Sequence, residues 1–171
     1  MTVLTILTEP DPILRQISQP VDQVDDALRA FMDDMLETMY AAQGIGLAAI
    51  QVGVAKRVIV IDISSEDNPG TPLYFVNPVI TPVGDDMSVY KEGCLSIPEI
   101  TENVERPAVI SIEYLDYHGV PQTLQADGLL ATCMQHEMDH LEGVLFIDKL
   151  SKLKRQLVMR KLKKRKNIKL I

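Results

Sequence analysis

The stretch QHEMDH, residues 135–140, is the part of this sequence around which the rest of the fold can be organised. Its two histidines, His136 and His140, are four residues apart, so on a helix both imidazoles leave the same face. Two neutral nitrogen ligands at this spacing can reach one divalent metal ion. Glu137 lies beside the first histidine, where an H-E-x-x-H carboxylate acts as general base on water. The stretch therefore predicts a helix that binds a metal.

Two histidines do not complete a catalytic metal site, which usually takes three protein ligands and leaves a position for water. In the longer H-E-x-x-H-x-x-G-x-x-H pattern the third ligand would fall at Phe146, which cannot bind a metal. Beyond Gly143 the sequence contains no Glu, His or Cys. We therefore expect the third ligand to come from upstream in the sequence.

Three upstream residues are candidates for this ligand: His118, Cys133 and Cys94. His118 lies in the stretch YHGVP, where an exposed turn histidine is the ordinary expectation. Cys133 is on the metal helix, but it lies seven residues before His140, a rise of about 10.5 Å, so we interpret it as a packing residue near the site. Cys94 lies on a predicted loop, EGCLSIP, whose thiolate could reach the helix in space. We choose Cys94 as the third ligand.

Length and composition indicate one globular domain with a core of its own, since 46% of the 171 residues are hydrophobic. The longest apolar runs are too short to span a membrane. No positive side chain precedes Arg15 and no sustained apolar segment opens the chain, so no signal peptide is predicted. Two cysteines in such a chain argue against a disulfide framework. We expect a cytoplasmic protein with no membrane contact.

Charge divides the chain into two parts. Residues 1–148 carry six basic and twenty-four acidic residues, a net charge of −18, whereas residues 149–171 carry eleven basic residues and no acid, a net charge of +11. Apolar residues recur at helical spacing over residues 150–163, which predicts an amphipathic helix with a basic outer face. We expect a catalytic domain over residues 1–148 and a basic helical tail over residues 149–171.

The remaining elements follow from hydrophobic spacing and turn residues. Apolar residues recur with a period of about 3.6 residues from Asp25 onward, which predicts a helix. The helix should end near Gln43 and Gly44, with its Met and aromatic stripe in the core. Asp127 is placed to be the N-cap of the metal helix. Alternation and turn residues predict short strands at residues 3–7, 57–63, 73–78, 79–84, 87–91, 108–116 and 122–126, the last two as a hairpin. The fold class is therefore α+β, with short, mostly antiparallel strands around a central metal-binding helix, an N-terminal helix and a basic C-terminal helix.

The stretch GIGLAAIQ, residues 44–51, is a weak signal when taken alone. It lacks the later glycine and the lysine of a phosphate-binding loop, and it follows a predicted helix, whereas a dinucleotide-binding loop follows a strand. Its small residues either allow a turn or let the backbone approach a ligand closely. In the second case Gln51 would offer an amide donor.

Together GIGLAAIQ, EGCLS and QHEMDHL resemble the three motifs of the peptide deformylases, in the order and at the separation found in that family. The resemblance extends from PDPILR near the N-terminus to about Leu150. It implies hydrolysis of the N-formyl group from the formylmethionine of newly made polypeptides, with release of formate. It also implies that Cys94, His136 and His140 bind one divalent metal, ferrous iron in the family, although zinc or nickel can occupy the same ligands.

The resemblance also implies roles for the surrounding residues. Glu137 would accept a proton from the attacking water and pass it to the leaving amine. The amide of Gln51 and the backbone N–H of Leu95 would stabilise the oxyanion. The substrate would lie extended along the GIGLAAIQ backbone, at Ile45 and Gly46, as an added strand. Helical spacing before His136 makes three further residues candidates for the wall of the methionine pocket: Leu129, Thr132 and Cys133.

Two other functions fit the same residues. A different amide hydrolase, such as a peptidase, could use the same constellation. A metal-stabilised binding module, whose basic tail docks on RNA, is the second alternative, although a structural metal site needs no base such as Glu137 and is usually closed by four protein ligands. If the protein acts on nascent chains, its basic tail could bind ribosomal RNA phosphates. The sequence leaves open the native metal, the preference beyond the first substrate residue and the oligomeric state.

Overall fold

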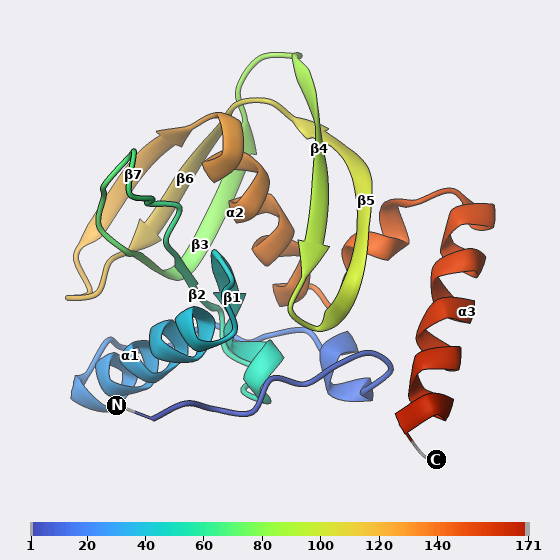
Figure 1. The fold of residues 1–171 in the computed structure, drawn as a ribbon. Helices are drawn as coiled ribbons and strands as arrows, with labels where there is room; N and C mark the ends of the chain where they lie inside the picture. Colours follow the sequence, from blue (N-terminus) through green and yellow to red (C-terminus); the bar gives the residue numbers. More distant parts are fainter. Residues whose placement is uncertain (1, 170–171) are drawn as a thin grey trace.

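Two antiparallel sheets and three α-helices form the fold over the residues that the structure describes (Figure 1). The structure is a computed structural model that describes the backbone of residues 2–169 and the side chains of residues 2–164. Its helices and antiparallel sheets confirm the α+β class predicted from the sequence.

The larger sheet has five strands in the order β1-β2-β3-β6-β7, and all neighbouring strands are antiparallel. Its strands are β1 (Gly46–Ala48), β2 (Val58–Ile61), β3 (Leu73–Pro82), β6 (Ile110–Leu115) and β7 (Pro121–Ala126). All four residues of β2 are buried, as its unbroken Val and Ile run predicts for a strand covered on both faces. β1 forms one edge of the sheet, and the β6–β7 hairpin confirms the predicted pairing.

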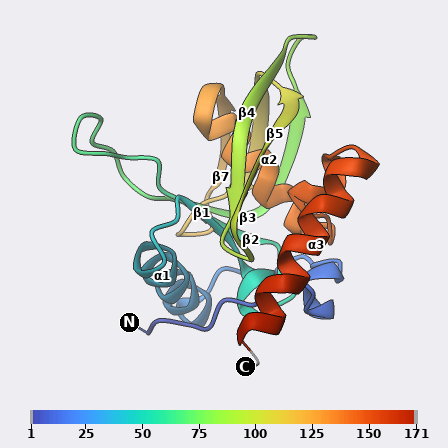
Figure 2. The ribbon, with the colours of Figure 1, turned by 45° about the vertical axis from the view of Figure 1, so that its right-hand side comes forward.

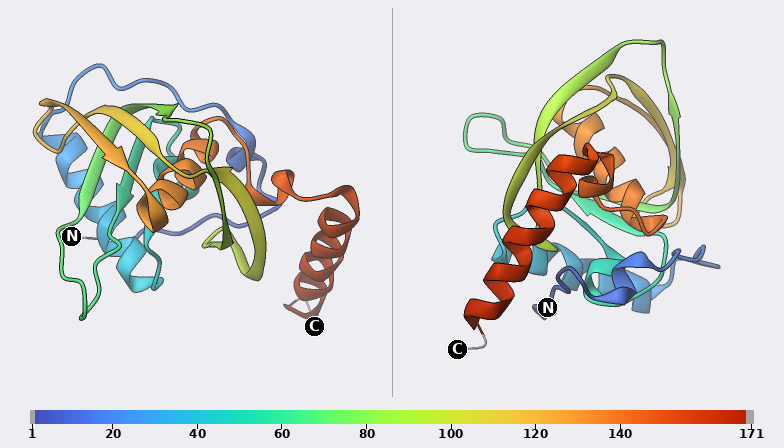
Figure 3. Two further views of the ribbon diagram at one scale, coloured as in Figure 1. Left: turned by 90° about the horizontal axis from the view of Figure 1, so that it is seen from above. Right: turned by 90° about the vertical axis from the view of Figure 1, so that its right-hand side faces the viewer.

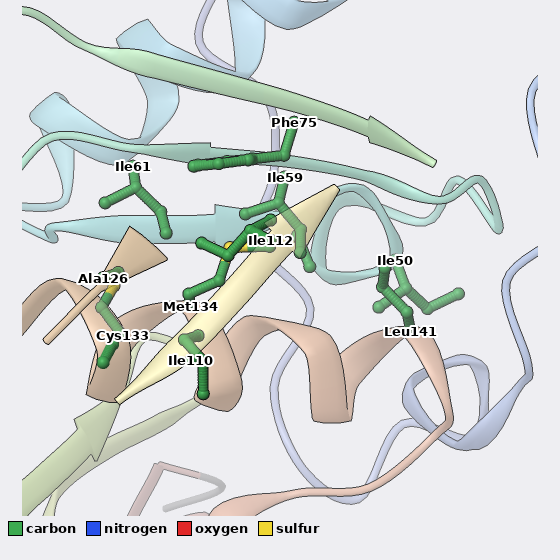
Figure 4. Close-up of a cluster of buried hydrophobic side chains, with 12 residues drawn as sticks. Ile50, Ile59, Ile61, Phe75, Ile110, Ile112, Ala126, Cys133, Met134 and Leu141 are labelled. Carbon is green, nitrogen blue, oxygen red and sulfur yellow. The ribbon is translucent and has the colours of Figure 1, made fainter. Parts of the chain in front are cut away.

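Helix α2 (Gly128–Leu141) is the helix predicted from QHEMDH, and it lies between the larger sheet and a second, two-stranded sheet (Figure 1). One face packs on the larger sheet, where Cys133 lies beside Ala126 and Met134 beside Ile112, while Leu141 lies beside Ile50 (Figure 4). Asp127 is at the N-cap position as predicted, but its side chain forms no capping hydrogen bond. The opposite face of α2 is thereby turned toward the second sheet.

The second sheet consists of the long hairpin β4 (Met87–Cys94) and β5 (Ile97–Pro107). Its strands pair from Met87 with Pro107 down to Cys94 with Ile97, so Cys94 is the last residue before the tight turn. Alternation indicated β4 in the sequence, whereas β5 was not predicted. Its polar residues over 101–103 hide the alternation, because this hairpin is exposed on one face.

Helix α1 (Asp26–Ala41) begins as predicted, with the Asp25 carboxylate accepting a hydrogen bond from the Leu28 N–H at 2.8 Å. Its apolar stripe is buried against β1 and β2, as predicted, except for Tyr40, which is 48% exposed. The helix does not end at a glycine in the left-handed conformation. Gln43, with φ 58°, takes that conformation in place of Gly44. Gly44 instead leaves room for the side chain of Leu95, since a Cβ at Gly44 would lie 2.6 Å from its Cδ1.

Two expected strand assignments are wrong. Residues 3–7 form no strand; this segment is extended but makes single hydrogen bonds, such as Leu7 N–H to Gln51 O at 2.7 Å, and no ladder. The strands expected at 73–78 and 79–84 are one strand, β3, with an irregularity between Val76 and Val79. A bulge lets Asn77, with φ 50°, take a conformation that otherwise signals a turn. The loop before β3 extends away from the body of the protein (Figure 2).

Helix α3 (Lys152–Lys169) begins two residues later than predicted and continues further along the tail. It follows the short 3-10 helix η3 (Phe146–Lys149) and lies beside β5 (Figure 3). Val158 is buried and Leu162 packs on the same cluster, but Leu153 and Leu157 are exposed, so the packed apolar edge is narrower than expected. Within the described part of the chain, no helix has both the length and the apolar character that crossing a membrane requires.

Candidate metal centre

His136 and His140 lie on the face of α2 that is turned toward the β4–β5 hairpin. Both are buried, with exposed fractions of 6% and 0%, and their ring centroids are 5.1 Å apart. Helical spacing alone accounts for this proximity, because residues i and i+4 lie one turn apart. The helix packs its other face on the larger sheet, so the two imidazoles are held in the space between the sheets.

Cys94 joins the two histidines from the end of β4. Its Sγ lies 3.3 Å from Nε2 of His140, and one donor atom from each of the three residues lies within 4.8 Å of the others. Within the described residues this is the single group of three or more His, Cys, Asp or Glu side chains close enough to hold a metal. His118 is exposed in the turn before β7, and Cys133 is buried on the sheet-facing side of α2.

The chemistry of these donors fits a divalent metal. Burial holds the pKa of His140 well below 6.5, which favours its neutral imidazole. A neutral imidazole is the form that binds metals. Burial raises the pKa of the Cys133 thiol well above 9.0, so Cys133 stays protonated and is a poor ligand. One thiolate and two imidazoles suit zinc, iron or nickel.

A buried ionic network that was not predicted from the sequence orients His136. Nδ1 of His136 donates to Oε1 of Glu92 at 3.0 Å, which leaves Nε2 free to face the metal position. Arg106 donates to both oxygens of Glu92, at 2.7 and 2.9 Å, and to Asp139 of the metal helix at 2.8 Å. Glu92 and Arg106 are each 5% exposed. One feature of the sequence could have indicated this network: Glu92 is two residues before Cys94, on the same face of a strand.

Glu137 lies beside the three donors without joining them. It is 4% exposed, and its Oε2 has no hydrogen-bond partner among the described residues. Burial raises the pKa of Glu137 to about 7. Its carboxylate faces β1 at Gly46, where a Cβ would be 2.9 Å from Oε1. The side chain is therefore held in the cavity beside the metal position.

Gln51 and Leu95 are both neighbours of Cys94. Gln51, in the 3-10 helix η2 (Ala49–Val52), is 1% exposed; its amide accepts from Ala48 N–H at 3.0 Å and donates to Ser96 Oγ at 3.0 Å. The same Nε2 lies 3.6 Å from Sγ of Cys94. Leu95 is the first residue of the tight turn after Cys94. The structure thus brings all three sequence motifs to one place.

A cavity of about 250 Å³ opens beside His136. All five residues predicted to contact substrate line it: Ile45, Gly46, Leu129, Thr132 and Cys133. His136, Glu137 and Leu95 also border it, together with residues that were not predicted: Gln43, Gly44, Tyr90, Lys91, Glu92 and Gly93. These extra residues come mainly from β4, whose position over α2 no local pattern in the sequence specifies.

Comparisons with known proteins point to one family. The sequence profile of the family described as polypeptide deformylase matches residues 3–156. A peptide deformylase from Pelagibacter ubique (strain HTCC1062) is 61% identical over 171 residues, covering 100% of this chain and 99% of that protein. Another from Maricaulis maris (strain MCS10) is 61% identical over 164 residues, covering 96% of this chain and 94% of that protein.

Solved structures agree with the sequence comparison. The crystal structure of a peptide deformylase from Ehrlichia chaffeensis is 43% identical and superposes with a TM-score of 0.93, covering 99% of this chain and 100% of that one. A second structure from that organism, in complex with actinonin, gives a TM-score of 0.90 at 44% identity, covering 96% of this chain and 98% of that one.

Proposed function

This chain belongs to the polypeptide deformylase family, and on that premise we propose that it is a metal-dependent hydrolase of the N-formyl group of formylmethionine at the start of newly made polypeptides, releasing formate. Family membership makes it an enzyme that removes the formyl group from nascent peptides. One observation carries the metal dependence: Cys94, His136 and His140 converge within 4.8 Å from two separate elements.

Cys94, His136 and His140 would hold one divalent metal. When bound, such a metal supplies Lewis-acid activation of water and of the scissile carbonyl at this position. We propose ferrous iron as the native metal, with zinc or nickel as substitutes for the same donors. Air exposure should then inactivate the freshly isolated protein, because ferrous iron and its thiolate ligand are both oxidisable. Activity that persists in air would favour zinc or nickel.

Glu137 would move the protons of the reaction. Its unpartnered Oε2 and its place beside the donors support a role in accepting a proton from the attacking water. The same carboxylic acid would then protonate the leaving amine nitrogen. Because Glu137 is buried, bulk water competes poorly for that proton.

The oxyanion that develops on the formyl carbonyl would be stabilised from two sides. The Nε2 amide of Gln51 and the backbone N–H of Leu95 are the donors proposed here, and their positions beside Cys94 support this role. Removing one such donor typically raises the barrier by about 2.7–4 kcal/mol. The hydrogen bond from Ala48 N–H to Gln51 Oε1 orients the amide so that its nitrogen faces Cys94.

The substrate backbone would add as a strand to the edge of the larger sheet at β1. β1 lies at the sheet edge and borders the cavity at Gly46, which supports this geometry. The methionine side chain would enter the cavity between Ile45 of that edge and the three α2 residues Leu129, Thr132 and Cys133. The volume of about 250 Å³ is large enough for a side chain of this size.

Hydrolysis of a formyl-Met peptide under anaerobic conditions, with metal analysis of the same sample, tests this function. We expect formate release from the formylated peptide, and none from the matched acetylated peptide. Cleavage of the acetylated peptide, or of an internal bond in an unblocked one, would instead indicate a different amide hydrolase. Metal-loaded protein without turnover on any of these would indicate a binding module.

The basic tail at residues 149–171 is proposed to bind ribosomal RNA phosphates and so bring the enzyme close to nascent chains. Exposed cations on α3, such as Lys161 and Lys163, support this role, while Val158 fixes the helix to the body of the protein. The chain's division at residue 148, and its cytoplasmic location, stay predictions.

Truncation after Lys149 tests the role of the tail. Hydrolysis of a short formyl peptide should stay nearly unchanged, whereas ribosome binding should weaken. Affinity of the full chain for ribosomes should also fall steeply with added salt. Equal ribosome binding by both forms at low salt would leave the tail as a packing and solubility element.

A further inference from the structure

One continuous N-terminal segment, residues 7–18, contacts all three motifs that form the site. Leu7 N–H donates to Gln51 O at 2.7 Å, and Glu9 N–H donates to Ser96 O at 2.8 Å. Further along, Ser18 N–H donates to Leu141 O at 2.8 Å, at the end of the metal helix. Figure 1 shows this segment, in dark blue, running beneath η2 toward η1 (Pro12–Arg15). We call residues 7–18 the N-terminal strap.

The far end of the strap is anchored by Arg15. Its Nη1 donates to Asp148 Oδ2 at 2.5 Å and lies 3.4 Å from Gly143 O. Arg155 of α3 approaches the other oxygen of Asp148 at 3.1 Å. Gly143, with φ 71°, has no room for a side chain, because a Cβ there would lie 2.4 Å from Arg15 O. The strap is therefore pressed closely against the turn that follows the metal helix.

These contacts matter because the candidate ligands lie on separate elements. Cys94 is the last residue of β4 in the small sheet, whereas His136 and His140 lie on α2. Their separation depends on how the hairpin turn, η2 and α2 are held relative to one another. A displacement of about 1 Å is enough to cost a hundredfold in catalysis, so small shifts of these elements are expected to be felt. The strap bonds to the main chain of each of them.

We propose that the N-terminal strap is a positioning segment that holds the Cys94 turn and Gln51 in register with the metal helix. Leu7 and Glu9 act through the carbonyls of Gln51 and Ser96, two residues whose side chains are themselves joined by a hydrogen bond of 3.0 Å. Arg15 and Ser18 act at the other end of the site, through the turn after α2. This inference rests on the proposed metal centre, since it concerns how tightly the ligands are held.

Proline at position 7 tests the strap, because it removes the N–H that donates to Gln51 O. Leu7→Ala keeps this N–H and controls for the lost side chain, and Thr5→Pro places a proline at an exposed position just outside the strap. Each zinc-loaded variant is mixed with a chelating dye to measure the rate of zinc release. Cobalt-loaded samples report the thiolate-to-metal absorption band, and kcat, KM and Tm are measured on the same preparations.

Leu7→Pro should release zinc about tenfold faster than the unmodified protein. Changing a group that orients a metal ligand typically weakens metal affinity by about 10–100-fold, and a faster release is how such a loss would show. Its cobalt–thiolate band should shift, and kcat should fall with little change in KM. Leu7→Ala and Thr5→Pro should resemble the unmodified protein in release rate and spectrum. If Leu7→Pro does not fold, Arg15→Gln provides the same test at the other anchor, with Arg29→Gln, which breaks an ion pair on α1, as its control.

Two outcomes would overturn the inference. The strap has no positioning role if Leu7→Pro and Arg15→Gln release zinc at the control rate and keep the control spectrum. The same conclusion follows if they lower Tm alone. An unmodified protein that binds no zinc would contradict the proposed metal centre itself, whereas zinc-binding protein with indifferent strap variants would contradict only the strap.

Discussion

Glu137 occupies space that is available only because residue 46 is a glycine. A Cβ at Gly46 would lie 2.9 Å from Glu137 Oε1 and 2.7 Å from Cys133 Sγ, closer than a Cβ normally approaches either atom. The edge strand β1 can therefore lie directly against α2 at this point. The absence of one side chain brings the proposed proton acceptor next to β1, the strand edge to which the substrate is proposed to add.

Gly46→Ala should displace Glu137 and lower kcat strongly while leaving the metal bound. The added methyl group meets two side chains at once, and α2 is held in the core by Met134 and Leu141. Steady-state kinetics and metal content measure the two effects. Gly70→Ala is the matched control, because its Cβ would meet Ser64 at an ordinary 3.6 Å. Normal activity in Gly46→Ala would show that catalysis does not depend on the position that Glu137 occupies beside Gly46.

Glu137→Ala should abolish turnover and retain the metal. Loss of a general base usually costs about 10²–10⁴ in rate. Metal content is expected to persist, because Glu137 is outside the group of three donors. Formate release and metal analysis on one sample check both parts. Near-normal activity, or stoichiometric loss of the metal, would contradict the proposed role.

Cys94→Ala should lose the metal, whereas Cys133→Ala should keep both metal and measurable activity. Only Cys94 of the two cysteines lies in the donor group, and burial keeps Cys133 protonated. Metal analysis after gel filtration distinguishes the variants. A metal-free Cys133→Ala beside a loaded Cys94→Ala would reverse the assignment.

Glu92→Gln should weaken metal binding about 10–100-fold, the usual effect of removing a partner that orients a metal-binding histidine. It should also destabilise the fold, since breaking a buried ion pair typically costs about 3–5 kcal/mol and Arg106 would lose its main counter-charge. Zinc affinity and denaturant unfolding measure these effects. Glu102→Gln is the control, because Glu102 is the cross-strand neighbour of Glu92 and is more exposed. Equal behaviour of the two variants would remove the orienting role.

Asp148→Asn should reduce the amount by which the free energy of unfolding falls at acid pH. Burial alone would raise the pKa of Asp148, but hydrogen bonds from Arg15 and Leu145 N–H outweigh it and hold the pKa below 3.8. A carboxylate with a lowered folded-state pKa stabilises the fold fully above its unfolded-state pKa. That contribution is lost as the pH falls through the folded-state pKa. Urea unfolding between pH 7 and pH 3 should therefore show a smaller loss of unfolding free energy in Asp148→Asn than in the unmodified protein. An equal loss in both proteins would contradict the lowered pKa of Asp148.

Local patterns in the sequence were sufficient for much of this protein. Spacing of 3.6 residues identified α1 and α2, and the i, i+4 spacing by itself placed His136 and His140 on one helix face. An unbroken Val and Ile run identified β2, and alternation with turn residues identified the β6–β7 hairpin. These features depend on residues a few positions apart, so a short window of sequence contains their cause. The charge division of the chain is equally a property of the sequence alone.

Tertiary structure decided what connects residues far apart in the chain. The ion pair of Glu92 with Arg106 spans two strands, and the hydrogen bond of Glu92 to His136 spans 44 positions. The strap joins Leu7 to Gln51, and a missing side chain at Gly46 makes room for Glu137. No local window contains both partners of such a contact, because the contact arises only when packed layers bring their backbones together. The sequence determined which groups this site could use, and the packing of α2 between two sheets determined which of them meet.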